Sequence, residues 1–146
     1  MKDWLVPREA VDAAVDRAHR RWTVREHVCD KSRWYDEFAE WAVRYGEPPL
    51  VEFPQTRPLM STASVAFRSA VTQGAITHDG NPAIACHLGN AIATPHARGF
   101  FINKSSKHSA RVIDLATATV MAHLRAIAPD LAGGRSVYET RAVIVV

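Results

Sequence analysis

The chain is expected to fold as an α/β protein, with a mostly parallel sheet flanked by helices. Short β-branched segments alternate with amphipathic helical segments, which predicts strands joined by helical crossovers. Apolar residues make up 47% and charged residues 23% of the 146 residues, as in an ordinary globular protein with a core. Because this length suits one domain, residues 1–146 are expected to form a single domain whose last part, about 129–146, is a tail.

The N-terminal segments alternate between helix and strand. Apolar residues recur at helical spacing over about 7–21, which predicts an amphipathic helix. Residues 23–29 alternate and are rich in β-branched side chains, which predicts a strand ending on Asp30. A stripe of four aromatic residues predicts a core-facing helix over about 32–45, and residues 50–53 read as a second short strand.

The middle of the chain is expected to hold another helix and a tight turn. Ser61 is predicted to open the helix and Gly74 to end it. Residues 77–82 contain the Asp-Gly and Asn-Pro dipeptides that are typical of turns. The pattern leaves residues 83–88 and 90–94 open between extended and short helical structure.

The last part combines a hairpin arm, a basic loop and a long apolar helix. Residues 99–103 are expected to form the second arm of a hairpin. The stretch from Lys104 to Arg125 then reads as a basic loop that runs into a helix carrying Asp114 in about its first turn. Apolar side chains at helical spacing predict that this helix faces the core, with the acid beside its apolar stripe.

Charge, cysteines and hydropathy limit the possible classes of function. The formal net charge of +3 is compatible with nucleic-acid binding but does not require it. Cys29 and Cys86 form no C-x-x-C pair and are expected to be buried thiols in a reducing compartment. No apolar run approaches a membrane span and the N-terminus lacks a signal-peptide core, so a cytoplasmic protein without a membrane partner is expected.

Several familiar catalytic and metal-binding motifs are absent from the sequence. There is no phosphate-binding P-loop, no G-x-S-x-G elbow and no G-x-G-x-x-G fingerprint. The seven histidines match no zinc spacing, so a structural zinc site is not expected. An unrelated small-molecule α/β enzyme is therefore disfavoured.

Two acids occupy positions at which α/β proteins place ligand-binding groups. Asp30 is predicted at the carboxyl end of a strand and directly before a helix. The alternative is that Asp30 or Ser32 only caps that helix. Asp114 is predicted near the start of the last helix, where the helix dipole favours a carboxylate, and the alternative is an ordinary helix-start acid.

Several stretches of the sequence follow one another in an order and at a spacing typical of one protein family. The sequence reads CDKSRW at 29–34, VEFPQT at 51–56, GAITHDGNP at 74–82, His87 with Asn90–Ala91, a helix with Lys104, Arg111, Ile113–Asp114, Ala118 and Met121–Ala122, and SVYE at 136–139. Together they resemble the nuclease domain of phage terminase large subunits, over about residues 5–140. The resemblance implies a ribonuclease H-like fold and a metal-dependent DNA endonuclease that acts in viral DNA packaging.

The resemblance also assigns roles to individual residues. In the family, acids from separate elements bind two divalent ions, usually Mg²⁺ or Mn²⁺. By position, Asp30 and Asp114 are expected to be the metal-binding and catalytic acids of this chain.

Three basic residues and one loop complete the expected site. Lys104, Lys107 and Arg111 are expected to contact the phosphates of double-stranded DNA. His78 and Asp79 match the family's loop and are candidates for a site loop; His78 is expected to be structural, with contact to the site as the alternative.

The chain also departs from the family pattern. Family members carry an ATPase domain with a P-loop, and their nuclease domain begins with a strand that bears an essential aspartate. This sequence shows neither, so an incomplete nuclease domain with a weak metal site is expected, from a phage or prophage gene. It is expected to need an upstream terminase fragment and to self-associate through an exposed sheet edge. The alternative is a non-catalytic module that binds DNA or the portal.

Overall fold

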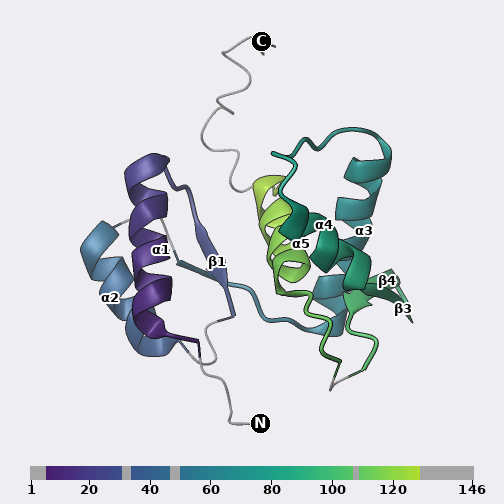
Figure 1. Ribbon diagram of the computed structural model, residues 1–146, viewed down its shortest axis with the longest axis horizontal. Helices are drawn as coiled ribbons and strands as arrows, with labels where there is room; N and C mark the ends of the chain where they lie inside the picture. Colours follow the sequence, from purple (N-terminus) through teal and green to yellow (C-terminus); the bar gives the residue numbers. More distant parts are fainter. Residues whose placement is uncertain (1–5, 31–33, 47–49, 107–108, 129–146) are drawn as a thin grey trace. The chain divides into compact units, whose positions relative to one another are not determined.

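The computed structural model describes residues 6–30, 34–46, 50–106 and 109–128 (Figure 1). Its residue contacts divide the chain into two compact units, Met1–Pro54 and Gln55–Val146, and each is described by itself. The predicted tail over 129–146 lies outside the described residues. That the whole chain forms one domain stays a prediction.

The first unit is a helix followed by a β-α-β crossover. Its elements are α1 (Arg8–Arg21), β1 (His27–Cys29), α2 (Tyr35–Tyr45) and β2 (Leu50–Glu52). The two strands pair in parallel, with His27 opposite Leu50 and Cys29 opposite Glu52. The Phe53 N–H extends this pairing by donating to the Cys29 carbonyl oxygen at 2.9 Å. A parallel pair requires a long connection between its strands, and α2 forms this connection.

Aromatic side chains of α2 make the core of the first unit. Phe38 and Trp41 are buried, and their ring centroids are 5.9 Å apart. The Trp34 ring lies 6.3 Å from that of Trp41 and extends the same stripe. The inward-facing aromatic stripe predicted from the sequence is therefore confirmed.

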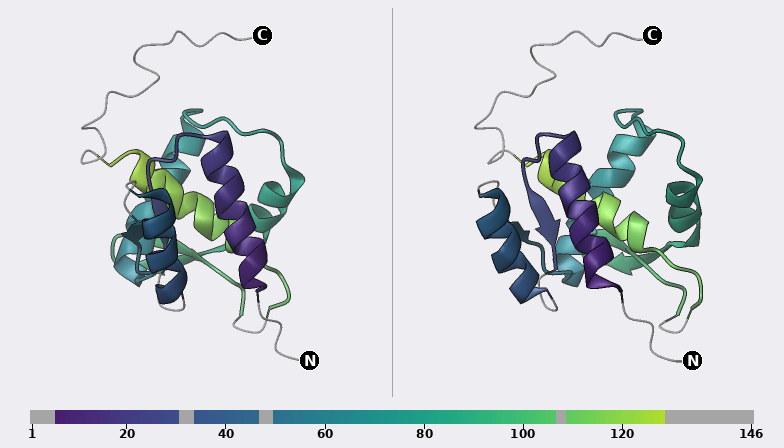
Figure 2. Two further views of the ribbon diagram at one scale, coloured as in Figure 1. Left: turned by 90° about the vertical axis from the view of Figure 1, so that its left-hand side faces the viewer. Right: turned by 60° about the vertical axis from the view of Figure 1, so that its left-hand side comes forward.

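The described residues of the second unit form three helices and one hairpin. Its elements are α3 (Arg57–Thr72), α4 (Pro82–Asn90), β3 (Ile92–His96), β4 (Gly99–Asn103) and α5 (Asp114–Ala126). The strands β3 and β4 are antiparallel, with Ile92 opposite Asn103 and His96 opposite Gly99. Helix α3 contacts both β4 and α5, and α4 packs against α5 (Figures 1 and 2).

The core of the second unit lies between α3, α5 and the hairpin. Its buried apolar side chains are Met60, Ala63, Ile113, Ala116, Val120 and Met121. The Ser64 hydroxyl, buried among them, donates to the Met60 carbonyl oxygen at 2.7 Å and accepts from the Ile102 N–H at 3.2 Å. A polar group at this depth needs such partners, and the bond with Ile102 joins α3 to β4.

The hairpin also requires a glycine where it meets α3. Gly99 opens β4 with φ of +119°, a conformation that side chains disfavour. A Cβ atom at this position would lie 2.8 Å from Cγ2 of Val65. The close approach of β4 to α3 thus depends on the missing side chain.

The α/β class predicted from the sequence is confirmed, while the sheet arrangement differs from the prediction. The described residues form two two-stranded sheets, one parallel and one antiparallel, instead of one mostly parallel sheet. The turn between His96 and Gly99 is too short for a crossover, so β3 and β4 must be antiparallel. The ribonuclease H-like fold stays an expectation drawn from the resemblance.

Several element boundaries also differ from those predicted. Helix α3 begins at Arg57 rather than Ser61, because Pro58 fits the first turn of a helix. Only His27–Cys29 of the strand predicted over 23–29 is paired. The open segments resolve into α4, which covers all of 83–88 and ends at Asn90, and into β3, which begins at Ile92.

Candidate functional site

Asp114 is the first residue of α5, and its side chain is exposed. The preceding residue, Ile113, is buried, and so are Ala116 and Val120 further along the helix. The helix therefore starts at the boundary between core and solvent, as the sequence pattern predicted. A carboxylate at this position is favoured by the positive end of the helix dipole, and its rigid helix can hold it toward a cation.

The neighbouring helix α4 holds the start of α5. The Leu115 N–H donates to Nδ1 of His87 at 3.0 Å, and Nδ2 of Asn90 donates to the Val112 carbonyl oxygen at 3.0 Å. The first N–H groups of a helix have no partner within it, so His87 caps α5 from another element. Sequence reasoning saw these two residues only as part of a family motif. Their spacing of three residues, which places them on one helix face, was the available signal.

The turn before α4 is built by its own polar side chains. The Gly80 N–H donates to Nδ1 of His78 at 3.0 Å, and the Asn81 N–H donates to the Asp79 carboxylate at 3.0 Å. The Asn81 side chain in turn accepts from the Ala83 N–H at 2.9 Å and caps α4. This turn therefore fixes where α4 begins, and a role of His78 and Asp79 in a functional site stays a prediction.

Asp30 lies in the first unit, directly after β1, and is half-buried. It follows the carboxyl end of a parallel strand, which is where the sequence placed it. The N-cap position of α2 is occupied by Trp34, so Asp30 is not the N-cap residue of that helix. The alternative through Ser32 falls outside the described residues.

The two cysteines differ from each other in exposure. Burial, and then the neighbouring charge of Asp30, raise the pKa of the half-buried Cys29 thiol to about 12. Cys86 lies on α4 and is exposed, so the prediction that both thiols are buried is wrong for this residue. The nine-residue helix α4 has no buried residue, which explains why the apolar character of Cys86 does not bring it into the core.

Two of the predicted basic residues, Lys104 and Arg111, lie in the loop between β4 and α5. Lys104 is half-buried directly after β4, Arg111 is exposed, and Lys107 lies outside the described residues. The loop is held by serines: the Ser105 hydroxyl donates to Ser109 Oγ at 3.3 Å, and Ser109 Oγ accepts from the Arg111 N–H at 3.2 Å. Contact of these cations with DNA stays a prediction.

The described residues fit a divalent metal centre only in part. Carboxylates are the right ligand type for Mg²⁺ or Mn²⁺. Asp30 belongs to the first unit and Asp114 to the second, and the described ranges contain no cluster of three or more histidine, cysteine, aspartate or glutamate residues. Two-metal sites use several carboxylates, so the described residues of neither unit complete such a site.

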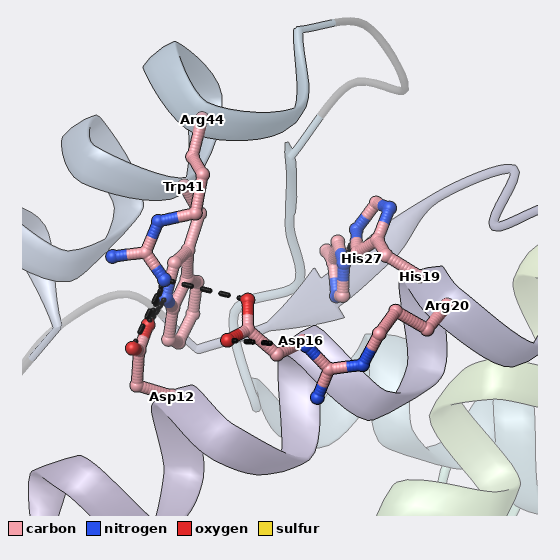
Figure 3. A network of polar contacts seen from close by, with 7 residues as sticks. All are labelled: Asp12, Asp16, His19, Arg20, His27, Trp41 and Arg44. Carbon is pink, nitrogen blue, oxygen red and sulfur yellow. Dashed lines mark hydrogen bonds and ion pairs between the residues drawn. The ribbon is translucent and has the colours of Figure 1, made fainter.

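A separate network of charged residues joins α1 to α2 within the first unit (Figure 3). The Asp12 carboxylate accepts from Nη1 of Arg44 at 2.8 Å and from Nε1 of Trp41 at 2.8 Å. The bond from Arg44 has the largest effect on the pKa of Asp12, the bond from Trp41 the next largest, and both lower it. Arg44 also lies 3.5 Å from Asp16, and Arg8 pairs with Glu37. These acids have protein cations as partners, which indicates a structural role.

Two histidines meet beside this network. The Nε2 atoms of His19 and His27 are 2.6 Å apart, and the His19 ring stacks on Tyr45 with centroids 3.9 Å apart. Burial of the ring is the main cause that lowers the pKa of His27, and electrostatic interaction with His19 is the second. No pattern in the sequence indicates this pair, because the two residues belong to different elements.

Comparison with known proteins identifies the family. The family model described as terminase large subunit, endonuclease domain, matches residues 30–130. The chain belongs to this terminase family. The matched stretch begins at Asp30, extends beyond the end of α5 and contains every candidate site residue, and α1 precedes it. The resemblance predicted from the sequence is thereby confirmed.

Two curated relatives of this terminase chain come from mycobacteriophages. The Gene 13 protein of Mycobacterium phage D29 is 31% identical over 128 residues, and that of Mycobacterium phage L5 is 30% identical over 128 residues. Each alignment covers 80% of this chain and 22% of the relative, so the chain spans about a fifth of their length. No solved structure matches. Within the described ranges, no helix is both long and apolar enough to cross a membrane.

Proposed function

We propose that this chain carries part of the site of a DNA endonuclease that acts in phage DNA packaging. The observation that carries the proposal is the terminase match over residues 30–130, which spans both candidate acids. Its relatives from two phages support the same role. The fold adds that one acid follows a parallel strand and the other begins a helix, two positions suited to ligand binding.

In this proposal Asp30 and Asp114 are metal-binding and catalytic residues for Mg²⁺ or Mn²⁺. Their oxygen atoms suit these hard cations. Because the described residues hold no cluster of three donors, metal binding by this chain is expected to be weak. Lys104, Lys107 and Arg111 would neutralise DNA phosphates beside the acid of α5.

The test is the nicking of supercoiled plasmid in Mn²⁺ by the wild type, Asp114→Asn and Asp30→Asn. The charge-matched control is Glu9→Gln, in the exposed first turn of α1 and outside the terminase match. Each acid variant is expected to lose more than about 100-fold in rate, since even outer-shell partners of a metal are worth about 10- to 100-fold. Mn²⁺ binding measured by electron paramagnetic resonance should fall in parallel, while circular dichroism shows that both variants are folded.

Equal nicking by the wild type and Asp114→Asn would refute the role of the acid. If the wild type shows neither nicking nor Mn²⁺ binding even after an upstream terminase fragment is added, the endonuclease proposal for this chain is refuted.

The second candidate function is a non-catalytic module that binds DNA or the portal. The observation that favours it is the lack of a three-residue metal cluster in the described ranges, combined with the exposed Arg111. Fluorescence anisotropy with a DNA duplex in EDTA tests the DNA version. Binding that weakens steeply with added salt and needs no metal would support it, and no binding at low salt would exclude it.

A further inference from the structure

We propose that His87 and Asn90 of α4 are positioning residues, which fix the start of α5 and thereby the carboxylate of Asp114. This inference rests on the proposed metal-binding role of Asp114. It concerns residues that act through the backbone of α5 and touch no metal or DNA themselves.

The geometry around Asp114 supports this role. Asn90 holds the carbonyl group of Val112 at 3.0 Å, and His87 holds the N–H of Leu115 at 3.0 Å. Between them, the side chain of Ile113 is anchored in the core with 6% exposure. The backbone is therefore fixed on both sides of Asp114, whose own side chain is exposed and available to a ligand.

The contact made by His87 replaces a cap that α5 cannot provide. The N-cap residue of α5 is Ile113, whose side chain cannot accept a hydrogen bond. The Leu115 N–H instead finds an acceptor on α4, which is Nδ1 of His87 at 3.0 Å. Losing this acceptor would leave the first turn of α5 free to fray at Asp114.

Helix α4 packs against α5 but contributes no buried residue to the core. Its own start is set by the Asn81 cap. Polar contacts at both ends of this short helix thus connect the turn at 77–82 to the start of α5. They restrain the backbone around Asp114.

The experiment compares His87→Ala with His87→Asn in the full chain. The Oδ1 atom of asparagine can occupy the place of Nδ1 and accept the same hydrogen bond, whereas alanine cannot. His96→Ala is the matched control, because it removes a half-buried histidine from β3 in the same unit. Two quantities are measured: hydrogen exchange of the Leu115 amide by nuclear magnetic resonance, and Mn²⁺ affinity.

In His87→Ala we expect the protection of the Leu115 amide to fall about tenfold, which corresponds to one lost hydrogen bond. The Mn²⁺ affinity should fall about 10- to 100-fold, as for other residues that orient a metal ligand. His87→Asn should restore both quantities, and the control His96→Ala should leave them at wild-type values. Asn90→Asp, which places an acceptor against the Val112 carbonyl, should lower both quantities.

Unchanged Leu115 protection in His87→Ala would overturn the inference. A His87→Asn variant as defective as His87→Ala would likewise overturn it, because the acceptor would then not be what matters. A wild type that binds no Mn²⁺ even after an upstream terminase fragment is added refutes the proposed function instead, and the amide measurement, which needs no metal, still decides whether α4 fixes the start of α5.

Discussion

The buried hydroxyl of Ser64 links α3 to β4, so Ser64→Ala is expected to destabilise the second unit. Ser64 is 2% exposed and is the acceptor for the Ile102 N–H at 3.2 Å. Alanine removes this acceptor but leaves the helix itself intact, because the backbone bonds of α3 do not involve the hydroxyl. The perturbation therefore removes one contact between a helix and a strand, together with the bond that the hydroxyl donates to the Met60 carbonyl oxygen within α3.

The size of the destabilisation depends on the Ile102 N–H, which loses its acceptor. A buried N–H without an acceptor costs about 1–3 kcal/mol. Alanine regains about 0.5 kcal/mol from its higher helix propensity. The free energy of unfolding should therefore fall by about 0.5–2.5 kcal/mol, measured by urea denaturation with far-ultraviolet circular dichroism.

Thr62→Ala provides the matched control in the same helix. The Thr62 hydroxyl also donates to a carbonyl one turn back, at 3.2 Å from the Pro58 oxygen, but it is exposed. Its removal should change the free energy of unfolding by no more than about 0.5 kcal/mol. If Ser64→Ala were no more destabilising than Thr62→Ala, the contact with Ile102 could not be what joins the strand to the helix.

Two further predictions concern titration and thiol reactivity. Since burial and then His19 lower the pKa of His27 from its ordinary 6.5, the unfolded chain takes up a proton first as the pH falls. The contribution of neutral His27 to the stability of the first unit should be fully present above pH 6.5 and should be lost as the pH falls through the folded-state pKa. A melting temperature that stays constant between pH 7.5 and 5 would contradict this prediction. Iodoacetamide at pH 8 should modify the exposed Cys86 well before Cys29, whose pKa is raised to about 12, and equal labelling by peptide mass spectrometry would contradict that order.

Local patterns in the sequence were sufficient to predict most individual elements. The periodicity of apolar residues predicted α1, α2 and α5, and the placement of Asp114 at the start of α5 is confirmed. The segment that became α4 was left open, because a helix of nine residues with no buried side chain has no periodic stripe to reveal it. Its turn and its Asn81 cap were the better indicators.

Contacts between distant residues could not be predicted. The bond from Leu115 to His87 joins residues 28 positions apart, and that from Trp41 to Asp12 joins residues 29 apart. Neither pair shows a pattern at short range, since the two partners meet only after their helices have packed. The hairpin arm predicted over 99–103 is confirmed as β4, but the division of the described strands into two separate sheets was not predicted, because the regular alternation of elements suggested one mostly parallel sheet. The functional roles of Asp30 and Asp114 stay predictions.

The parallel pairing of β1 with β2 has a consequence for the order in which the chain acquires structure. His27 pairs with Leu50, so the ends of a long segment must meet before the pair exists, whereas the hairpin pairs His96 with Gly99 across a tight turn. Contacts between residues close in sequence form faster than those that close a long loop. During synthesis on the ribosome, the strand end that carries Asp30 can therefore take its place only after β2 has also been made.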